Sequence, residues 1–544
     1  MVAALALSGC AVGPNFREPA PPAVDRYTPT AMPSSTVSAA TSGGDAQRFL
    51  AGRSVPQRWW TTFGNAELDR RVQQAFRHSP SISAAQAALR QAEETAKAAR
   101  GSLFPSLDAN VGATRTKESA AQTGTGKALG PFTVYNAGVS VGYVFDIFGG
   151  VRRGIEAQQA QADVSRAQLD ATYLTLAANV ITASLQEASL REQVKATHEI
   201  VASLKQELDI AQKQQAIGAK SLSDTLAVRS QLAAIEATLP PLEKQLSATQ
   251  NQLATYLGVT PAQLQLQPVT LAEVTLPTDI PISLPSTVVA QRPDIRAASA
   301  QLHAATAAVG VATADMLPKL SLNGSLGSQS LTESGLFAAG SGGWSIGLGL
   351  LQPLFHGGQL LHQKRAAEAG MDVALADWQQ TVLVAFQNVA DALQALDYDA
   401  QSLRAQSISE RDAEKLLSLT RAQYRVGAVD YLTLLSAERQ YQQARIAEIA
   451  ARASRLADTA ALYAALGGGW EASPESQPMD GHSGAASAQT LSTTVRQPER
   501  SDRGRSQAFS ESQPMDGRSG AASAQTPSTT VRQPERSDHG RSQE

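Results

Sequence analysis

The chain has 544 residues and a formal net charge of −3, with 46 lysines and arginines against 49 aspartates and glutamates. So small a charge argues against a general nucleic-acid-binding protein, which needs a basic excess, and the single cysteine excludes a disulfide framework and a zinc cluster made of cysteines. The sequence contains no run of about 18 apolar residues, the length that a membrane-spanning helix requires.

The cysteine, Cys10, follows an apolar stretch and ends the sequence Leu7-Ser8-Gly9-Cys10. An apolar segment that closes on small residues is typical of a secretory signal, and this one resembles a bacterial lipobox. The pattern predicts that residues 1–9 are a signal peptide remnant and that Cys10 is lipidated, which places the chain in the cell envelope. The alternative is a buried cysteine without a special role.

The rest of the chain falls into three stretches of different composition. Residues 10–58 are rich in proline, serine, threonine and alanine, which predicts a lipidated, extended N-terminal segment. Residues 59–470 are rich in alanine, glutamine and leucine and strongly periodic. Residues 471–544 are polar, which predicts a disordered tail. Within this tail Glu475–Gln507 recurs almost unchanged as Glu511–Gln543, which indicates a recent duplication without an apolar face to stack.

The periodic stretch is a divergent tandem repeat. Its halves are residues 59–258 and 291–470, and residues 259–290 connect them. The matching motifs are Phe104-Pro105-Ser106-Leu107 and Leu317-Pro318-Lys319-Leu320, Phe148-Gly149-Gly150 and Phe355-His356-Gly357-Gly358, and Ile217-Gly218-Ala219 and Val426-Gly427-Ala428. Each half is predicted to contain a helix, two strands, a very long helix, a tight turn and a return helix.

The long helices are predicted at residues 151–217 and 359–426, which contain no proline and one glycine each. Either could form a rod on the order of 100 Å long. Apolar residues along both recur at steps of three and four in two adjacent stripes, as expected for helices that pack against a neighbour on each side.

Return helices are expected at Ser221–Leu257 and Asp430–Leu466, each after a glycine of the kind that ends helices. Pro240 and Pro241 predict a kink in the first of them, whereas the second contains no such break.

Four segments alternate between apolar and small polar residues, which predicts strands. They are residues 107–114, 135–147, 320–327 and 344–350. The strands fit either a transmembrane barrel or an amphipathic sheet on a soluble core. Four strands cannot close a barrel, and open edges are not tolerated in lipid, so a barrel requires several chains. Three copies would supply twelve strands and twelve helices. The predicted fold class is therefore an α+β membrane protein.

These features resemble the TolC-like outer-membrane factor family, in its lipoprotein branch of OprM/NodT-like efflux channels. The resemblance covers about Leu7 to Trp470. It rests on the duplicated layout and on short motifs: Cys10-Ala11-Val12-Gly13-Pro14, Trp59-Trp60-Thr61-Thr62-Phe63, Tyr424-Arg425-Val426-Gly427-Ala428, Tyr431-Leu432-Thr433-Leu434-Leu435 and Ala465-Leu466-Gly467-Gly468-Gly469-Trp470.

The resemblance implies a homotrimer in the outer membrane of a Gram-negative bacterium. Its 12-stranded β-barrel would continue into a 12-helix α-barrel in the periplasm, with residues 259–290 as an equatorial connector. The implied partners are a periplasmic adaptor protein, an inner-membrane pump of the RND type and outer-membrane lipid, with no nucleic acid. The adaptor would contact the helix tips at Gly218, Ala219, Gly427 and Ala428.

The resemblance also implies a periplasmic gate just after the second tip. Leu432 and Arg439 match its apolar and basic positions, while Ser436 stands where the family has an acid. Glu438 is two positions from Ser436 and is expected to face elsewhere on a helix. Asp224 is the candidate acidic partner of Arg439. The alternative is that these are solvated surface charges, worth little individually.

No zinc-protease motif, phosphate-binding loop or nucleophile elbow is present, and the seven histidines are scattered. We therefore expect no enzyme activity, no cofactor and no metal. The predicted function is a passive exit duct for small molecules in drug and xenobiotic export. The competing hypothesis is a structural periplasmic coiled-coil protein, such as an adaptor or scaffold, which would not need the four strands.

Overall fold

The computed structural model describes residues 11–117 and 130–468, and the elements below belong to one unit, Met1–Pro478. The signal peptide remnant at residues 1–9, the lipidation site Cys10, Trp470 and the duplicated tail at residues 471–544 lie outside the described residues. None of the helices in the described ranges is both long and apolar enough to cross a lipid bilayer.

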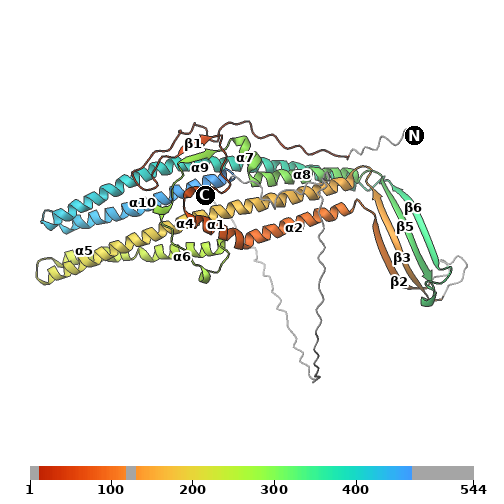
Figure 1. The fold of residues 1–544 in the computed structure, drawn as a ribbon, viewed down its shortest axis with the longest axis horizontal. Coiled ribbons are helices and arrows are strands. Elements are labelled where there is room, and N and C mark those ends of the chain that lie inside the picture. The colour runs from red at the N-terminus through yellow and green to blue at the C-terminus, as the bar shows by residue number, and fades with distance from the viewer. Residues whose placement is uncertain (1–10, 118–129, 469–544) are drawn as a thin grey trace, which may run out of the picture. The chain divides into compact units, whose positions relative to one another are not determined.

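The predicted order of elements is confirmed in both halves of the repeat (Figure 1). The first half contains α1 (Ala66–His78), α2 (Pro80–Gly101), β2 (Ser106–Thr116), β3 (Phe132–Phe145), α4 (Gly150–Ala216), α5 (Leu222–Glu236) and α6 (Leu239–Tyr256). The second contains α7 (Pro285–Gln291), α8 (Pro293–Ala314), β5 (Lys319–Ser330), β6 (Gly342–Leu351), α9 (Gln359–Arg425) and α10 (Tyr431–Ala465). The helices α4 and α9 have 67 residues each, as expected from their lack of proline.

The first return helix is divided, which is the predicted effect of the proline pair. α5 ends at Glu236, and α6 begins at Leu239, directly before Pro240 and Pro241. The prolines therefore occupy the first turn of a helix, where backbone N–H groups have no partner inside the helix. α10 has no proline and runs unbroken over 35 residues.

Two short strands link the N-terminal segment to the connector between the halves. β1 (Arg48–Ala51) pairs in parallel with β4 (Asp279–Ile282). Beside them, the 3-10 helix Trp59–Phe63 buries both tryptophans and Phe63 in the main core, where Trp59 packs against Tyr463 of α10. This core holds the long helices at their middle, because it joins α1, α4 and α10 to segments from far along the chain.

The four longer strands form one antiparallel sheet in the order β2-β3-β5-β6. β3 leads into α4 and β6 into α9, so the sheet lies at one end of the long helices and the two helix tips at the other (Figure 1). All four predicted strands are confirmed, each within a few residues of its expected bounds.

Candidate functional site: duct wall, helix tips and gate helix

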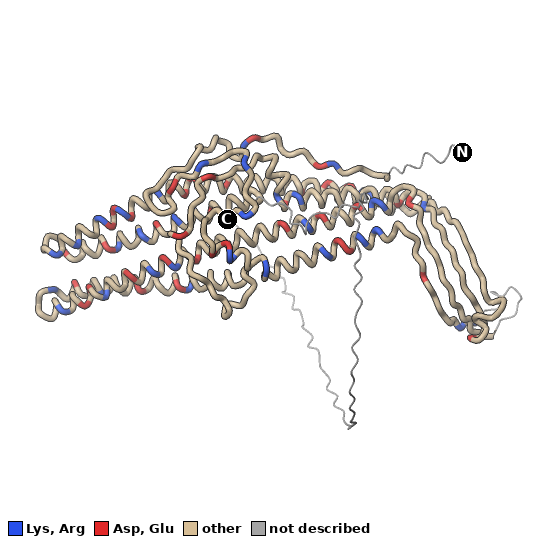
Figure 2. Tube along the Cα trace, viewed as in Figure 1, with Lys and Arg blue, Asp and Glu red and all other residues tan. Residues whose placement is uncertain are grey.

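The register of the sheet gathers small polar residues on one face. Asn110 is opposite Gly138, Ser140 is opposite Ser325, and Ser325 and Ser345 share a hydrogen bond of 2.8 Å between their hydroxyls. Because side chains alternate along each strand and these positions are in register, most positions on this face are polar residues or glycine. Figure 2 shows that charged residues are concentrated on the helices and nearly absent from the strands.

The opposite face of the sheet is apolar and exposed. Leu326 is opposite both Val139 and Trp344, and Trp344 is 77 % exposed. Other exposed side chains on this face are Leu107, Val111, Ile346, Leu348 and Leu350. A sheet with one lipid-compatible face and one water-compatible face is what a membrane duct requires. Within the described residues β2 and β6 each keep one unpaired edge, so closure in lipid requires further copies.

The two helix tips have the same turn in both halves. Gly218 and Gly427 adopt φ values of 76° and 75°, which an L side chain rarely takes, and the next residue closes the turn in each case. The N–H of Ala219 donates to the carbonyl of Gln214 at 2.8 Å. In the second tip, the N–H of Ala428 donates to the carbonyl of Gln423 at 2.9 Å. These four predicted contact residues thus sit at the ends of two matching hairpins.

A lysine joins the two tips to each other. The Nζ of Lys220, next to the first tip, lies 4.1 Å from the ring centre of Tyr431 and 5.1 Å from that of Tyr424. Contacts of this kind contribute about 0.5–1 kcal/mol at exposed sites. Sequence reasoning missed this pairing because residues 220 and 431 are adjacent only through the fold.

The predicted gate residues lie on one exposed face of α10. Leu432, Ser436 and Arg439 follow the helical spacing of four and three, and Leu432 is 60 % exposed. The structure does not bring Asp224 to Arg439 within one chain. Asp224 instead accepts from the N–H of Ser221 at 3.2 Å, in a capping box at the start of α5. Arg439 has no ion pair within the described ranges, 11–117 and 130–468.

Glu438 lies on the other side of α10, as its spacing from Ser436 predicts, and is only 8 % exposed. Arg421 of α9 donates to its Oε1 at 3.0 Å, and Glu207 on α4 is its acidic neighbour. Tyr431 donates to Oε2 of Glu207 at 3.2 Å. Burial and the neighbouring Glu207 raise the pKa of Glu438 to about 8.

Sequence reasoning gave this cluster no role. Its signal is an acid within an apolar helical stripe, since Glu438 follows Tyr431, Leu434 and Leu435 at steps of three and four. A second acid pair joins α9 and α10, where burial and Asp458 raise the pKa of Asp399 to about 7.

The start of the described chain is anchored where the strands meet the helices. The N–H of Val12 donates to the carbonyl of Phe148 at 3.0 Å, just before α4. The buried guanidinium of Arg153 donates to the carbonyl of Val12 at 3.2 Å and to Oδ1 of Asn15 at 2.5 Å. Gly13 has φ of 90° and touches the backbone of α8. This places residue 11 beside the sheet end of α4.

A two-faced sheet, paired long helices and hairpin tips define an outer-membrane exit duct subunit. The chain matches the family model for "Outer membrane efflux protein" over residues 72–259 and 284–468, and it belongs to that family.

Curated relatives and solved structures agree with this membership. The pyoverdine export outer membrane protein OpmQ of Pseudomonas putida is 32% identical over 458 residues, which are 84% of this chain and 94% of that protein. The outer membrane protein OprJ of Pseudomonas aeruginosa is 30% identical over 87% of this chain and 95% of its own. The outer-membrane channel OprN superposes with a TM-score of 0.74 at 27% identity, over 84% of this chain and 99% of that one.

The protein is therefore a subunit of a trimeric outer-membrane efflux channel of the Gram-negative envelope. It extends into the periplasm and serves as the exit duct of a tripartite system with a periplasmic adaptor and an inner-membrane pump. The competing hypothesis of a coiled-coil scaffold is wrong, since the strands and the family match both belong to a channel.

Proposed function

We propose that this duct carries small organic molecules, including drugs and xenobiotics, with little selectivity of its own and without any chemical step. The observation that supports this is the polar face of the sheet. The ionisable side chains that the described strands place on it are Asp108 and Lys319, and its other positions are mainly asparagine, serine, threonine and glycine. Such a lining holds water and offers few groups that would discriminate between solutes.

The names of the relatives support the same view. OpmQ is named for pyoverdine export, and TtgC of Pseudomonas putida, 28% identical over 86% of this chain, is named for toluene efflux. Pyoverdine and toluene have little chemistry in common. We therefore assign the choice of substrate to the pump, which we propose to be of the RND type.

The test is an exchange experiment in a Gram-negative host that lacks its own efflux ducts. This chain and OprJ are expressed in turn with one fixed adaptor and pump, and growth inhibition is measured for a panel of drugs and solvents. The range of exported compounds should stay the same when the duct is exchanged and change when the pump is exchanged. A range that follows the duct would refute the proposal.

The lipid anchor at Cys10 is a second proposal. Its support is the position of Ala11, which packs against the backbone of Gly149 at the sheet end of α4, so an acyl chain on the preceding residue would reach the bilayer that surrounds the sheet. Labelling with an alkyne analogue of palmitate should mark the protein, and Cys10→Ser should remove the label. An unlabelled protein with Cys10 intact would contradict the anchor.

The gate at Leu432, Ser436 and Arg439 stays a proposal as well, supported by their common exposed face on α10. Alanine at Ser436 and Arg439 should raise the conductance of the closed trimer in planar bilayers. The matched control is Arg404→Ala, an exposed arginine on α9. Equal conductance of both variants and the native chain would place the gate elsewhere.

The helix tips complete the proposal. Adaptor docking at Gly218, Ala219, Gly427 and Ala428 is supported by the apolar side chains beside them, because Ile217 and Val426 are 80 % and 79 % exposed. Ala428→Trp should weaken co-purification with the adaptor and leave the trimer intact.

A further inference from the structure

The polar face of the sheet carries two ionisable side chains within the described strands, and only one of them has a charged partner. The Nζ of Lys319 lies 2.8 Å from Oδ1 of Asp315, just before β5. Among the described residues, no lysine, arginine or histidine lies within ion-pair distance of Asp108, which is exposed. The carboxylate of Asp108 therefore adds a net negative charge to this face.

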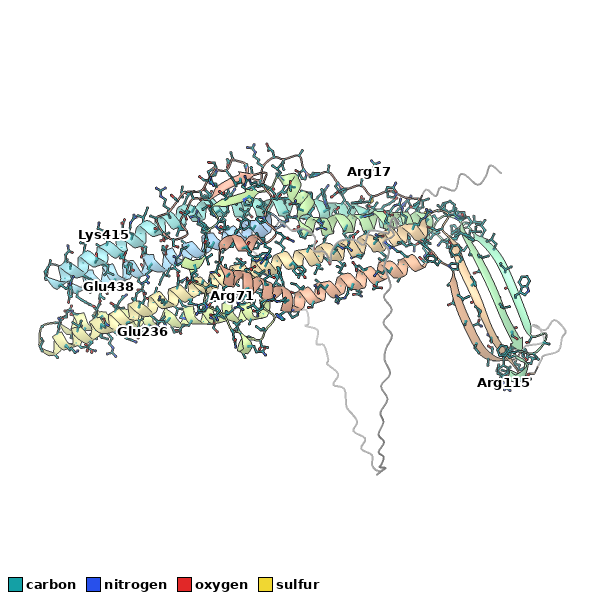
Figure 3. The ribbon with its side chains drawn as sticks, in the orientation of Figure 1. Arg17, Arg71, Arg115, Glu236, Lys415 and Glu438 are labelled. Carbon is teal, nitrogen blue, oxygen red and sulfur yellow. The ribbon has the colours of Figure 1, made fainter. Side chains whose placement is uncertain are left out.

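Asp108 lies near the end of the sheet that adjoins the helices, because β2 begins at Ser106, shortly after α2. The other charged residue of β2, Arg115, lies at the far end of the sheet (Figure 3). Strand alternation puts Arg115 on the apolar face, about 24 Å along the strand from Asp108. This separation is more than twice the Debye length of about 10 Å at 0.1 M salt, so Arg115 does not neutralise the carboxylate.

The second half of the repeat has no charge at the matching position. Leu107 matches Leu320 in the repeated motifs, so Asp108 matches Ser321, which is neutral. Each chain therefore contributes one such carboxylate, and the trimer contributes three, at the level where the long helices lead into the strands. Charged side chains that surround a channel attract ions of the opposite sign and repel ions of the same sign.

We propose that the three Asp108 carboxylates give the duct a preference for cationic over anionic solutes where solutes enter the β-barrel. Cations and neutral molecules pass this level readily, whereas anions meet a repulsive potential. The inference rests on the proposed duct function and deepens it, because it adds a preference by charge sign to a lining that otherwise discriminates little. The preference weakens in concentrated salt, since counter-ions screen the carboxylates.

The experiment measures the local potential with a cysteine placed beside the carboxylate. Ser140 of β3 is directly opposite Asp108 on the polar face, so Ser140→Cys places a thiol about 6 Å from it. The purified trimer is treated in about 0.1 M salt with two methanethiosulfonates, one carrying a trimethylammonium and the other a sulfonate. The ratio of the two labelling rates reports the potential, because any change in the reactivity of the thiol itself cancels. The chain without the introduced cysteine gives the background from Cys10.

Removal of the charge should lower the ratio of the cationic to the anionic labelling rate. For one unit charge about 6 Å away in water, screened over about 10 Å, Asp108→Asn should lower this ratio about threefold. Asp108→Lys should lower it about tenfold, because the sign of the charge is reversed. Thr114→Cys is the matched control probe, on the same face of β2 but about 20 Å further along the strand. There Asp108→Asn should change the ratio by less than about 1.2-fold.

Two results would overturn the proposal. One is a ratio at position 140 that Asp108→Asn leaves unchanged, and the other is an equal change at positions 140 and 114, which would mean that the effect is not local. If Asp108→Asn does not assemble, Asp108→Ser carries the same expectation and the same refutation. Because the readout is chemical labelling at one level of the wall, it is separate from the pump-exchange test, and a failure of one proposal is distinguishable from a failure of the other.

Discussion

Gly13 and Gly427 offer a matched pair of substitutions, because both adopt a positive φ but in different surroundings. A Cβ on Gly427 would meet nothing within 4 Å. Gly427→Ala should therefore cost only the free energy of holding alanine in the left-handed conformation, about 1–2 kcal/mol. A Cβ on Gly13 would lie 2.5 Å from Cα of Gly310, well inside contact distance. Overpacking of this kind adds about 1–3 kcal/mol, so we expect about 2–5 kcal/mol for Gly13→Ala.

The free-energy cost of Gly13→Ala is comparable to the stabilisation that hydrogen bonds give to the N-terminal segment. The backbone bond of Val12 and the two bonds from Arg153 contribute together about 3–7 kcal/mol. Gly13→Ala should therefore release the N-terminal segment locally and raise the rate of trypsin cleavage at Arg17 about tenfold or more, since each 1.4 kcal/mol is a factor of ten. Gly427→Ala should leave that rate within about twofold. Equal rates for native chain and Gly13→Ala would refute the reasoning.

Three further predictions concern the sheet and the core. Ile346→Arg, on the apolar face, should cost about 2–4 kcal/mol in the membrane and lower the amount of trimer in outer-membrane fractions, whereas Ser345→Arg should leave the amount unchanged and shift ion selectivity toward anions. Arg71 is fully buried within 3.9 Å of Glu187, and Arg71→Met should lower stability by about 3 kcal/mol in denaturant unfolding. Asp399→Asn should flatten the loss of apparent Tm as the pH rises from about 4 to 7, because the raised pKa stabilises the folded state only at lower pH.

The elements of this fold could be predicted because each depends on local chemistry. Two stretches without proline became helices of 67 residues, and the glycines at their ends became left-handed turns. Alternation of apolar and small residues located four strands, because the period of a strand is two. The break before Pro240 also followed from a local rule, the missing N–H of proline.

The site could be predicted only in part. Spacing along α10 was enough to put Leu432, Ser436 and Arg439 on one face and Glu438 on another. Spacing could not show that the carboxylate of Asp224 caps its own helix, α5. Nor could it show that Glu207 lies beside Glu438, because that proximity depends on how α4 and α10 are packed.

The amino-acid sequence by itself determined the long helices, the glycine turns at their ends and the four longer strands, and its short motifs carried the resemblance that implied the family and the exit-duct function. The tertiary structure decided which charges are buried and which partners they find. The reason is one of range: propensity, capping and side-chain alternation act over a few residues, whereas burial and the pKa of a carboxyl depend on atoms more than 200 residues away, as between Glu207 and Glu438.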